Sequence, residues 1–162
     1  MVTVSLKPWQ DLNEAERQGV LALSVSAQQV EYAGTVERSV RACQDGPASE
    51  VVGLAILEGM RVVGFLVLKR GSRAPAWARE GAAVVSALRI DLACQGKGLG
   101  SAALRILPSW VATHWPDARA VSLSVDEDNL AGRQAYTKAG FVDHGVREEG
   151  RIGWVRYMSR PQ

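Results

Sequence analysis

Residues 88–101 constrain the fold of this chain more than any other stretch. The stretch begins with apolar and β-prone residues, passes through three closely spaced glycines, and continues into an apolar run at helical spacing that ends near His114. Apolar, β-prone residues before a glycine-rich break indicate a strand, and apolar residues three or four positions apart indicate a helix. The sequence therefore predicts a strand, a glycine loop and a helix in immediate succession.

This order of elements suits the binding of an anion. The N-terminus of a helix presents unpaired N–H donors and the positive end of the helix dipole, and glycines allow the backbone to approach a phosphate closely. Lys97 adds a positive charge beside the loop, and Ser101 adds a hydroxyl in the first helical turn. We therefore expect a phosphate or pyrophosphate ligand. A purely structural turn with a glycine cap is the alternative, and three glycines within five positions disfavour it.

Several classes of glycine loop compete for this stretch. A nucleotide-binding P-loop requires Ser or Thr after its lysine, and Lys97 is followed by Gly98, which excludes that class. The dinucleotide fingerprint fits better, because Gly98, Gly100 and Ala103 have its spacing. Asp126 also ends the next apolar strand, where that fingerprint has its acidic residue. However, too few residues follow Asp126 to complete a doubly wound sheet.

Two sequence blocks resemble the GNAT superfamily of N-acetyltransferases. Residues 95–100 match the family's Gln/Arg-x-x-Gly-x-Gly/Ala loop at every specified position. Residues 129–141 resemble the family's Asn-x-x-Ala-x-x-x-Tyr-x-x-x-Gly-Phe block. Gly132 stands where that block usually has alanine, which weakens the helix slightly. The two blocks follow each other in the family's order.

The resemblance implies a single N-acetyltransferase (GNAT) domain of the mixed α/β class over residues 1–162. Its element order is β-α-α-β-β-β-α-β-α-β-β, an α+β mixed sheet whose central strand leads into the glycine loop. Apolar patterns and turn residues place the strands at 3–7, 51–57, 62–69, 84–92, 120–125, 141–146 and 152–158. They place the helices at about 14–23 behind a cap at Asn13, then at 36–43, 101–114 and 130–138.

The resemblance also implies acetyl-CoA as co-substrate. The family places the pantetheine arm beside the central strand, where backbone groups of Leu88 and Ile90 would pair with its amides and the Ile90 N–H would polarise the thioester. Gln95 and the loop amides would hold the pyrophosphate, and Asn129 would contact the pantetheine arm or hold the neighbouring strand. A cap for the following helix is the alternative role of Asn129, and it is compatible with the others. The predicted acetyl-CoA contacts are Leu88, Arg89, Ile90, Gln95, Gly96, Lys97, Gly98, Leu99, Gly100, Ser101 and Asn129.

Tyr136 resembles the general acid of the family. In acetyl transfer an amine with a pKa of about 10.4 must lose a proton, and a departing thiolate with a pKa of about 8.5 gains one. A phenol suits the donor role; a packed tyrosine with a hydrogen-bonded hydroxyl is the alternative. The base is open, because Ser124 stands where some relatives carry glutamate. The candidates are Asp91, Glu80, Asp126, Glu31 and a water chain.

The connection between the first two helices covers the acceptor site in GNAT folds. Here it carries Gln28, Glu31 and Tyr32, which we interpret as substrate contacts together with Asp91. Surface helix residues, or a loop-fixing role for Asp91, are the alternative.

Within the superfamily, residues 23–32, 90–91 and 95–98 are most similar to the bacterial spermine/spermidine (diamine) acetyltransferases, although Ala87 replaces an arginine of that type. We therefore expect transfer to a primary amine of a small molecule, with polyamines as the first candidates. Aminoglycosides, a protein N-terminus or lysine, and a non-catalytic acyl-CoA-binding or regulatory module are the alternatives.

Composition limits the remaining classes. The 162-residue chain is 47% hydrophobic and 22% charged with a net charge of +2, which is typical of a globular protein without a nucleic-acid partner. The sequence has no membrane-spanning apolar run and no pattern of a signal peptide, so we expect a cytoplasmic protein. Cys43 and Cys94 lack metal-ligand spacing, and we expect no metal and two free thiols. Pairing of the C-terminal hairpin into a homodimer stays open.

Overall fold

The computed structural model describes residues 3–27, 30–31 and 34–162. Its strands are β1 (Ser5–Pro8), β2 (Val51–Glu58), β3 (Arg61–Lys69), β4 (Ala82–Ile90), β5 (Ala120–Asp126), β6 (Val142–Gly150) and β7 (Gly153–Pro161). Its α-helices are α1 (Glu14–Leu21), α3 (Val36–Asp45), α4 (Leu99–His114) and α5 (Leu130–Lys138). Short 3-10 helices lie at Trp9–Asp11, Gly71–Arg73 and Leu92–Cys94.

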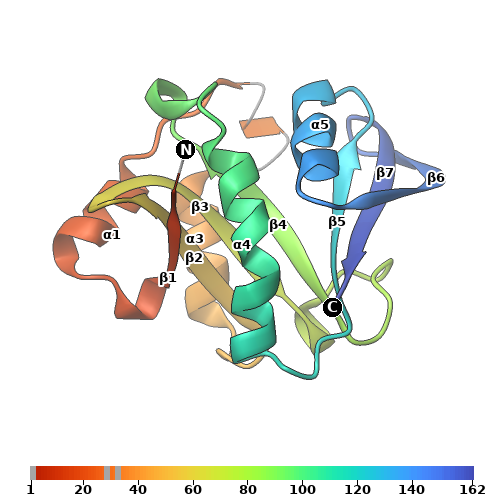
Figure 1. Cartoon of the computed structure of the whole chain (residues 1–162), viewed down its shortest axis with the longest axis horizontal. Helices are drawn as coiled ribbons and strands as arrows, with labels where there is room; N and C mark the ends of the chain where they lie inside the picture. The colour runs from red at the N-terminus through yellow and green to blue at the C-terminus, as the bar shows by residue number, and fades with distance from the viewer. Residues whose placement is uncertain (1–2, 28–29, 32–33) are drawn as a thin grey trace.

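The strands form one seven-stranded sheet in the order β1-β2-β3-β4-β5-β7-β6 (Figure 1). Neighbouring strands are antiparallel except β4 and β5, which run parallel. A parallel pair needs a crossover connection, and α4 provides it. The glycine loop therefore lies at the centre of the sheet, between β4 and α4.

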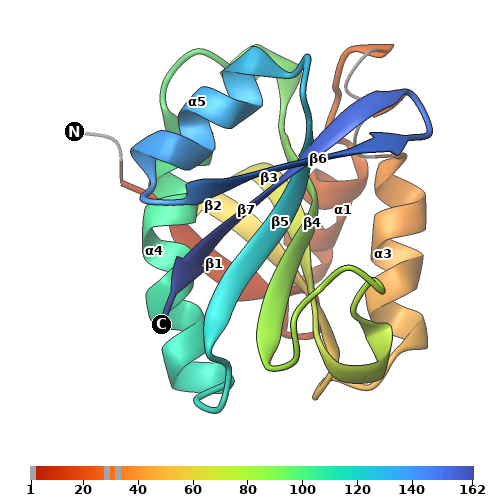
Figure 2. The same cartoon turned by 90° about the vertical axis from the view of Figure 1, so that its right-hand side faces the viewer.

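Helices cover both faces of the sheet. Figure 2 shows α1 and α3 on one face and α4 and α5 on the other. Each face has its own apolar core: Val20, Val40 and Phe65 belong to the first, and Leu54 and Leu104 to the second. Because both faces are covered, β2 and β3 are almost continuously apolar rather than alternating.

The structure confirms the predicted fold class and the order of the elements. Asn13 caps α1 as predicted: its side chain accepts a hydrogen bond from the Glu16 N–H at 2.8 Å, and the Glu16 carboxylate accepts one from the Asn13 N–H at 2.8 Å. The two C-terminal strands are longer than predicted. None of the described helices is long and apolar enough to cross a membrane.

Only some of the apolar side chains of α1 are buried. Val20 is fully buried, whereas Ala15 and Leu21 are exposed. The helix approaches β3 through Gly19, where an added Cβ would lie only 3.2 Å from the Val62 Cβ. Gly19 and Val20 therefore bring α1 against the sheet.

Candidate active site

The parallel strands β4 and β5 separate halfway along their length. They pair only from Ala82 opposite Ala120 to Val85 opposite Leu123, although β4 continues to residue 90 and β5 to residue 126. Ligands of open α/β sheets bind where neighbouring strands part at their carboxyl ends. The separation of β4 and β5 therefore indicates a ligand-binding site at this end of the two strands.

A β-bulge bends β4 at the same point. Between the pairs Phe65–Arg89 and Val67–Ser86, two residues of β4 face a single residue of β3. The first of the two, Ala87, has a φ of 55°, a left-handed conformation that costs an L-residue about 1 kcal/mol or more. The bulge turns β4 away from β5 and leaves its backbone open to a ligand.

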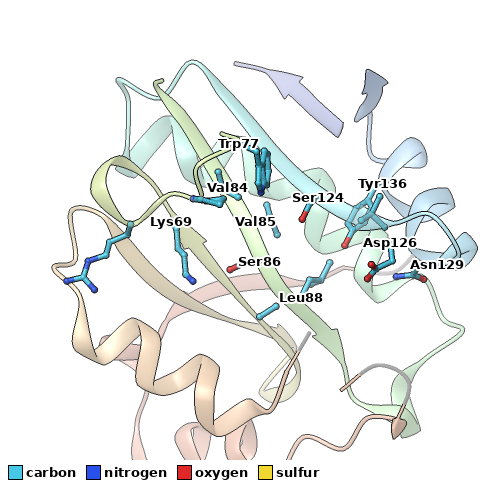
Figure 3. Close-up of a pocket in the computed structure, with 14 residues that line it drawn as sticks. Lys69, Trp77, Val84, Val85, Ser86, Leu88, Ser124, Asp126, Asn129 and Tyr136 are labelled. Carbon is cyan, nitrogen blue, oxygen red and sulfur yellow. The ribbon is translucent and has the colours of Figure 1, made fainter. Parts of the chain in front are cut away.

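A cavity of about 390 Å³ lies between the separated strands (Figure 3). Residues of β3, β4, β5 and α5 and of the loop between β3 and β4 line it. Figure 3 shows Tyr136, Asp126 and Asn129 grouped at one end of the cavity, with Lys69 across from them.

The glycine loop follows the same end of β4. Gly96 and Gly98 have φ values of 81° and 80°, and a Cβ at either position would meet no atom within 4 Å. Gly98 is the N-cap of α4, and no side chain of the described residues caps this helix end. The open space and the uncapped N–H groups fit a phosphate or pyrophosphate.

Side chains within the loop hold it in shape. The Gln95 amide donates a hydrogen bond to the Ile90 carbonyl at 2.9 Å. The Asp91 carboxylate accepts hydrogen bonds from the Ser24 N–H at 2.8 Å and from the Ala93 N–H at 3.3 Å. Asp91 thereby ties the loop to the segment after α1, and it does not line the cavity between the strands.

Tyr136 reaches the cavity from α5, where its ring packs against Phe141 with centroids 6.2 Å apart. Burial raises the pKa of Tyr136 to about 12, so the phenol stays protonated at neutral pH. Within the described part of the chain no residue hydrogen-bonds its hydroxyl. A protonated phenol with an unused donor suits transfer of a proton to a bound molecule.

Asp126 and Asn129 lie beside Tyr136. Burial raises the pKa of the Asp126 carboxyl against the opposing charge of Arg151, and a raised pKa makes a carboxylate a stronger proton acceptor. Asn129 caps α5, because its side chain accepts a hydrogen bond from the Gly132 N–H at 3.1 Å. A Cβ at residue 132 would lie 2.6 Å from the Asn129 Nδ2, so the glycine gives this asparagine its place over the helix end.

The predicted acetyl-CoA contacts lie in two places. Leu88 and Asn129 line the cavity, and residues 95–101 form the loop and the first turn of α4. The Arg89 side chain turns to the opposite face of the sheet: it is 2% exposed, and its Nη2 donates to the Ser39 Oγ at 2.7 Å. Only the backbone of Arg89 is therefore available at the cleft.

The predicted acceptor contacts do not lie together in the cavity between β4 and β5. Glu31 lines a second cavity beside the first, whereas Gln28 and Tyr32 lie outside the described residues and stay predictions. Among the four carboxylates considered as the base, Asp126 is the one that lines the cavity with Tyr136. Glu80 lines a separate cavity beside β7.

Lys69, Trp77 and Ser86 line the cavity but are not among the predicted site residues. Lys69 ends β3, Ser86 precedes the bulge, and the Trp77 ring lies 4.7 Å from that of Tyr157. In the sequence, only a lysine at the end of an apolar strand and a tryptophan in a polar loop could have indicated that Lys69 and Trp77 belong to a site. The bulge that brings these residues together leaves no mark in the sequence pattern.

Comparison with known families identifies the class of this fold and site. The model of the acetyltransferase (GNAT) family matches residues 12–141, a range that contains the glycine loop, Asn129 and Tyr136. The chain belongs to the GNAT acetyltransferase family.

Among curated proteins, YbbJ of Bacillus subtilis (strain 168), named an uncharacterised N-acetyltransferase, is 29% identical over 102 residues. The match covers 62% of this chain and 64% of that protein, so it spans less than two thirds of the relative's length.

Solved structures share the fold over almost the whole chain. The aminoglycoside acetyltransferase AAC(6')-Ib, in complex with ribostamycin and coenzyme A, superposes with a TM-score of 0.74 at 20% identity, covering 99% of this chain and 94% of that one. Spermidine N-acetyltransferase from Vibrio cholerae, in complex with CoA and spermine, has a TM-score of 0.73 at 16% identity, covering 99% and 96%. At these identities the likeness establishes the fold.

Proposed function

We propose that this protein is an acetyl-CoA-dependent N-acetyltransferase that acts on a primary amine of a small molecule. One observation carries the proposal: Tyr136 lines the cavity that opens where β4 and β5 part, and the glycine loop follows the same end of β4. The family, the name of the Bacillus relative and the CoA held in both solved structures support it.

The backbone of β4 and of the glycine loop would hold acetyl-CoA. The N–H groups at residues 96–101 suit its pyrophosphate, because they combine uncapped donors with the helix dipole. Beyond Val85 the edge of β4 that faces β5 has no strand partner in the described structure. The backbone of Leu88 and the Ile90 N–H would therefore pair with the amides of the pantetheine arm as an added strand would, whereas the Ile90 carbonyl already accepts the Gln95 amide. Bound acetyl-CoA supplies the thioester.

Tyr136 and Asp126 divide the proton transfers between them. The amine nitrogen forms a bond to the thioester carbonyl carbon, and the bond from that carbon to sulfur breaks. Asp126 accepts the proton that the amine releases, and Tyr136 donates a proton to the departing sulfur. The products are the acetamide and the free CoA thiol, and exchange with solvent returns both side chains to their starting states.

Small-molecule amines are the acceptors we infer. The solved relatives hold spermine and ribostamycin, which supports an acceptor of this size. We call the cavity between β4 and β5, which Tyr136 lines, the catalytic cavity. The second cavity adjoins it and provides room for such a molecule next to Tyr136.

Replacing Tyr136 tests the proposed chemistry. We expect Tyr136→Phe to lower kcat by about 100-fold or more, because it removes the proton donor, and to leave the affinity for acetyl-CoA within about twofold. Thiol release from acetyl-CoA across a panel of amines measures the first quantity, and calorimetry measures the second.

Tyr157→Phe is the matched control. The Tyr157 hydroxyl donates a hydrogen bond to the Glu148 carboxylate at 3.1 Å on the exposed hairpin and does not line the catalytic cavity. The kcat of Tyr157→Phe should equal that of the wild type. Unchanged turnover in Tyr136→Phe would refute the role of this residue as general acid.

A further inference from the structure

A second cavity, of about 740 Å³, adjoins the catalytic one on the side of α3. The two cavities share three lining residues, Lys69, Ser86 and Ala87, so they meet over the bulge of β4. A molecule bound in the second cavity therefore has a direct way past Ala87 toward Tyr136.

The second cavity is lined by three cationic side chains and one carboxylate. Arg38 comes from α3, Lys69 from the end of β3 and Arg151 from the turn between β6 and β7, whereas Glu31 is the acidic residue. Three elements far apart in the sequence thus direct positive charge toward one space. Asp126 adds a second carboxylate, at the end of the catalytic cavity opposite Lys69 (Figure 3).

The three cations of this cavity form no ion pair with the described residues of the protein. Within the described part of the chain, neither Lys69 nor Arg38 forms an ion pair or a side-chain hydrogen bond. Arg151 donates a hydrogen bond to the Glu31 carbonyl at 2.7 Å, and its charge acts on the Asp126 carboxyl without a direct ion pair among the described residues. Arg147 and Arg156, by contrast, both form ion pairs with Glu127.

Unpaired charge of one sign inside a cleft attracts ligands of the opposite sign and repels those of the same sign. A polyamine would bring several positive charges into a space that already holds three. A molecule with one amine and one anionic group fits better, because its two ends match the two ends of the joined cavity.

We propose that the acceptor of this enzyme carries a carboxylate or phosphate in addition to its primary amine. Lys69, Arg38 and Arg151 bind the anionic group, and the amine extends past Ala87 toward Asp126 and Tyr136. This inference rests on the proposed acetyltransferase function and narrows its substrate class.

Three primary amines with four-carbon chains test the charge preference. 4-Aminobutyrate, butylamine and putrescine carry an anion, no charge and a cation at the end opposite the reacting amine. We expect kcat/KM for thiol release to be at least about tenfold higher for 4-aminobutyrate than for the other two. O-Phosphoethanolamine against ethanolamine extends the comparison to phosphate and distinguishes the two anions. A rate for putrescine equal to or above that for 4-aminobutyrate would overturn the proposal.

Two arginines of the same helix provide the matched variants. Arg38 and Arg41 are both exposed on α3, but only Arg38 lines the cavity. We expect Arg38→Gln and Lys69→Gln to raise KM and Kd for the anionic amines at least about tenfold, with unchanged affinity for acetyl-CoA, and Arg41→Gln to match the wild type. Equal behaviour of Arg38→Gln and Arg41→Gln would also overturn the proposal.

Calorimetry of the same amines in the presence of CoA distinguishes a failure of the proposed acetyltransferase function from a failure of the proposed anion site. If no amine releases thiol while 4-aminobutyrate still binds in a manner that depends on Arg38, the proposed function fails and the anion site stands. If amines are acetylated without regard to their charge, the function stands and the anion site fails.

Discussion

At the scale of single residues, Ala87 shows how the site departs from the regular sheet. Its left-handed φ of 55° lies in the middle of a strand, where most residues are extended. Strained backbone persists only where the surroundings enforce it, and it gathers at functional sites. Here the strain bends β4 at the junction of the two cavities, so we interpret it as part of how the cleft is formed.

Opposite substitutions at Ala87 test this interpretation. We expect Ala87→Val to lower the free energy of unfolding by about 2 kcal/mol, because a β-branched residue tolerates positive φ poorly. Ala87→Gly should leave the stability unchanged or raise it, because glycine adopts this φ freely. Urea unfolding measures both. If the two variants lose the same stability, the strain at this residue does not exist.

At the scale of elements, the glycine loop and α4 act as one unit. Gly98 caps the helix with a φ of 80° and open space around it. Asp91 and Gln95 hold the segment that leads into the loop, through hydrogen bonds with the backbone of Ser24 and of Ile90. These hydrogen bonds fix the entry of the loop before a ligand arrives, which reduces the entropy lost on binding.

Substitutions at two glycines distinguish the role of the loop in binding from the effect of backbone strain on stability. Gly98 and Gly145 both have positive φ and no atom within 4 Å of an added Cβ, and Gly145 lies in the outermost strand β6. We expect Gly98→Ala and Gly145→Ala each to cost about 1 kcal/mol of stability. Only Gly98→Ala should weaken acetyl-CoA binding, by about tenfold or more in calorimetry. Equal affinities in both variants would contradict the assignment of the loop.

At the scale of the whole molecule, the cleft divides the sheet into two halves. Strands β1 to β4 carry α1 and α3 on one face, and β5, β7 and β6 extend the sheet beyond the parallel pair (Figures 1 and 2). Among the described residues, the halves pair directly only through the first part of β4 and β5. A ligand held between them would bridge both halves and so stabilise the folded chain as a whole.

Thermal unfolding with different ligands tests this bridging and the identity of the ligand. A ligand that binds only the folded state at 100 times its Kd adds about 2.7 kcal/mol, which corresponds to about 5 to 10 °C for a domain of this size. We expect acetyl-CoA and CoA to raise the melting temperature by this amount and NAD(H) to leave it unchanged. The reverse result would favour the dinucleotide alternative considered for Gly98, Gly100 and Ala103.

The sequence by itself determined the local elements of this protein. Apolar periodicity and glycines place the strand, loop and helix around residues 88–114, and the cap at Asn129 and the spacing to Tyr136 define α5. These features depend on neighbours within one or two turns of chain, so the order of residues is enough to specify them.

Only the tertiary structure decided how these parts form a site. The bulge at Ala87, the turn of Arg89 toward α3, the use of Asp91 within the loop and the meeting of Arg38, Lys69 and Arg151 all depend on contacts between distant segments. Periodicity specifies which residues face a core, but register, bulges and the splaying of paired strands follow from packing the whole sheet. The acceptor cavity and its charge therefore became visible only when the chain was folded.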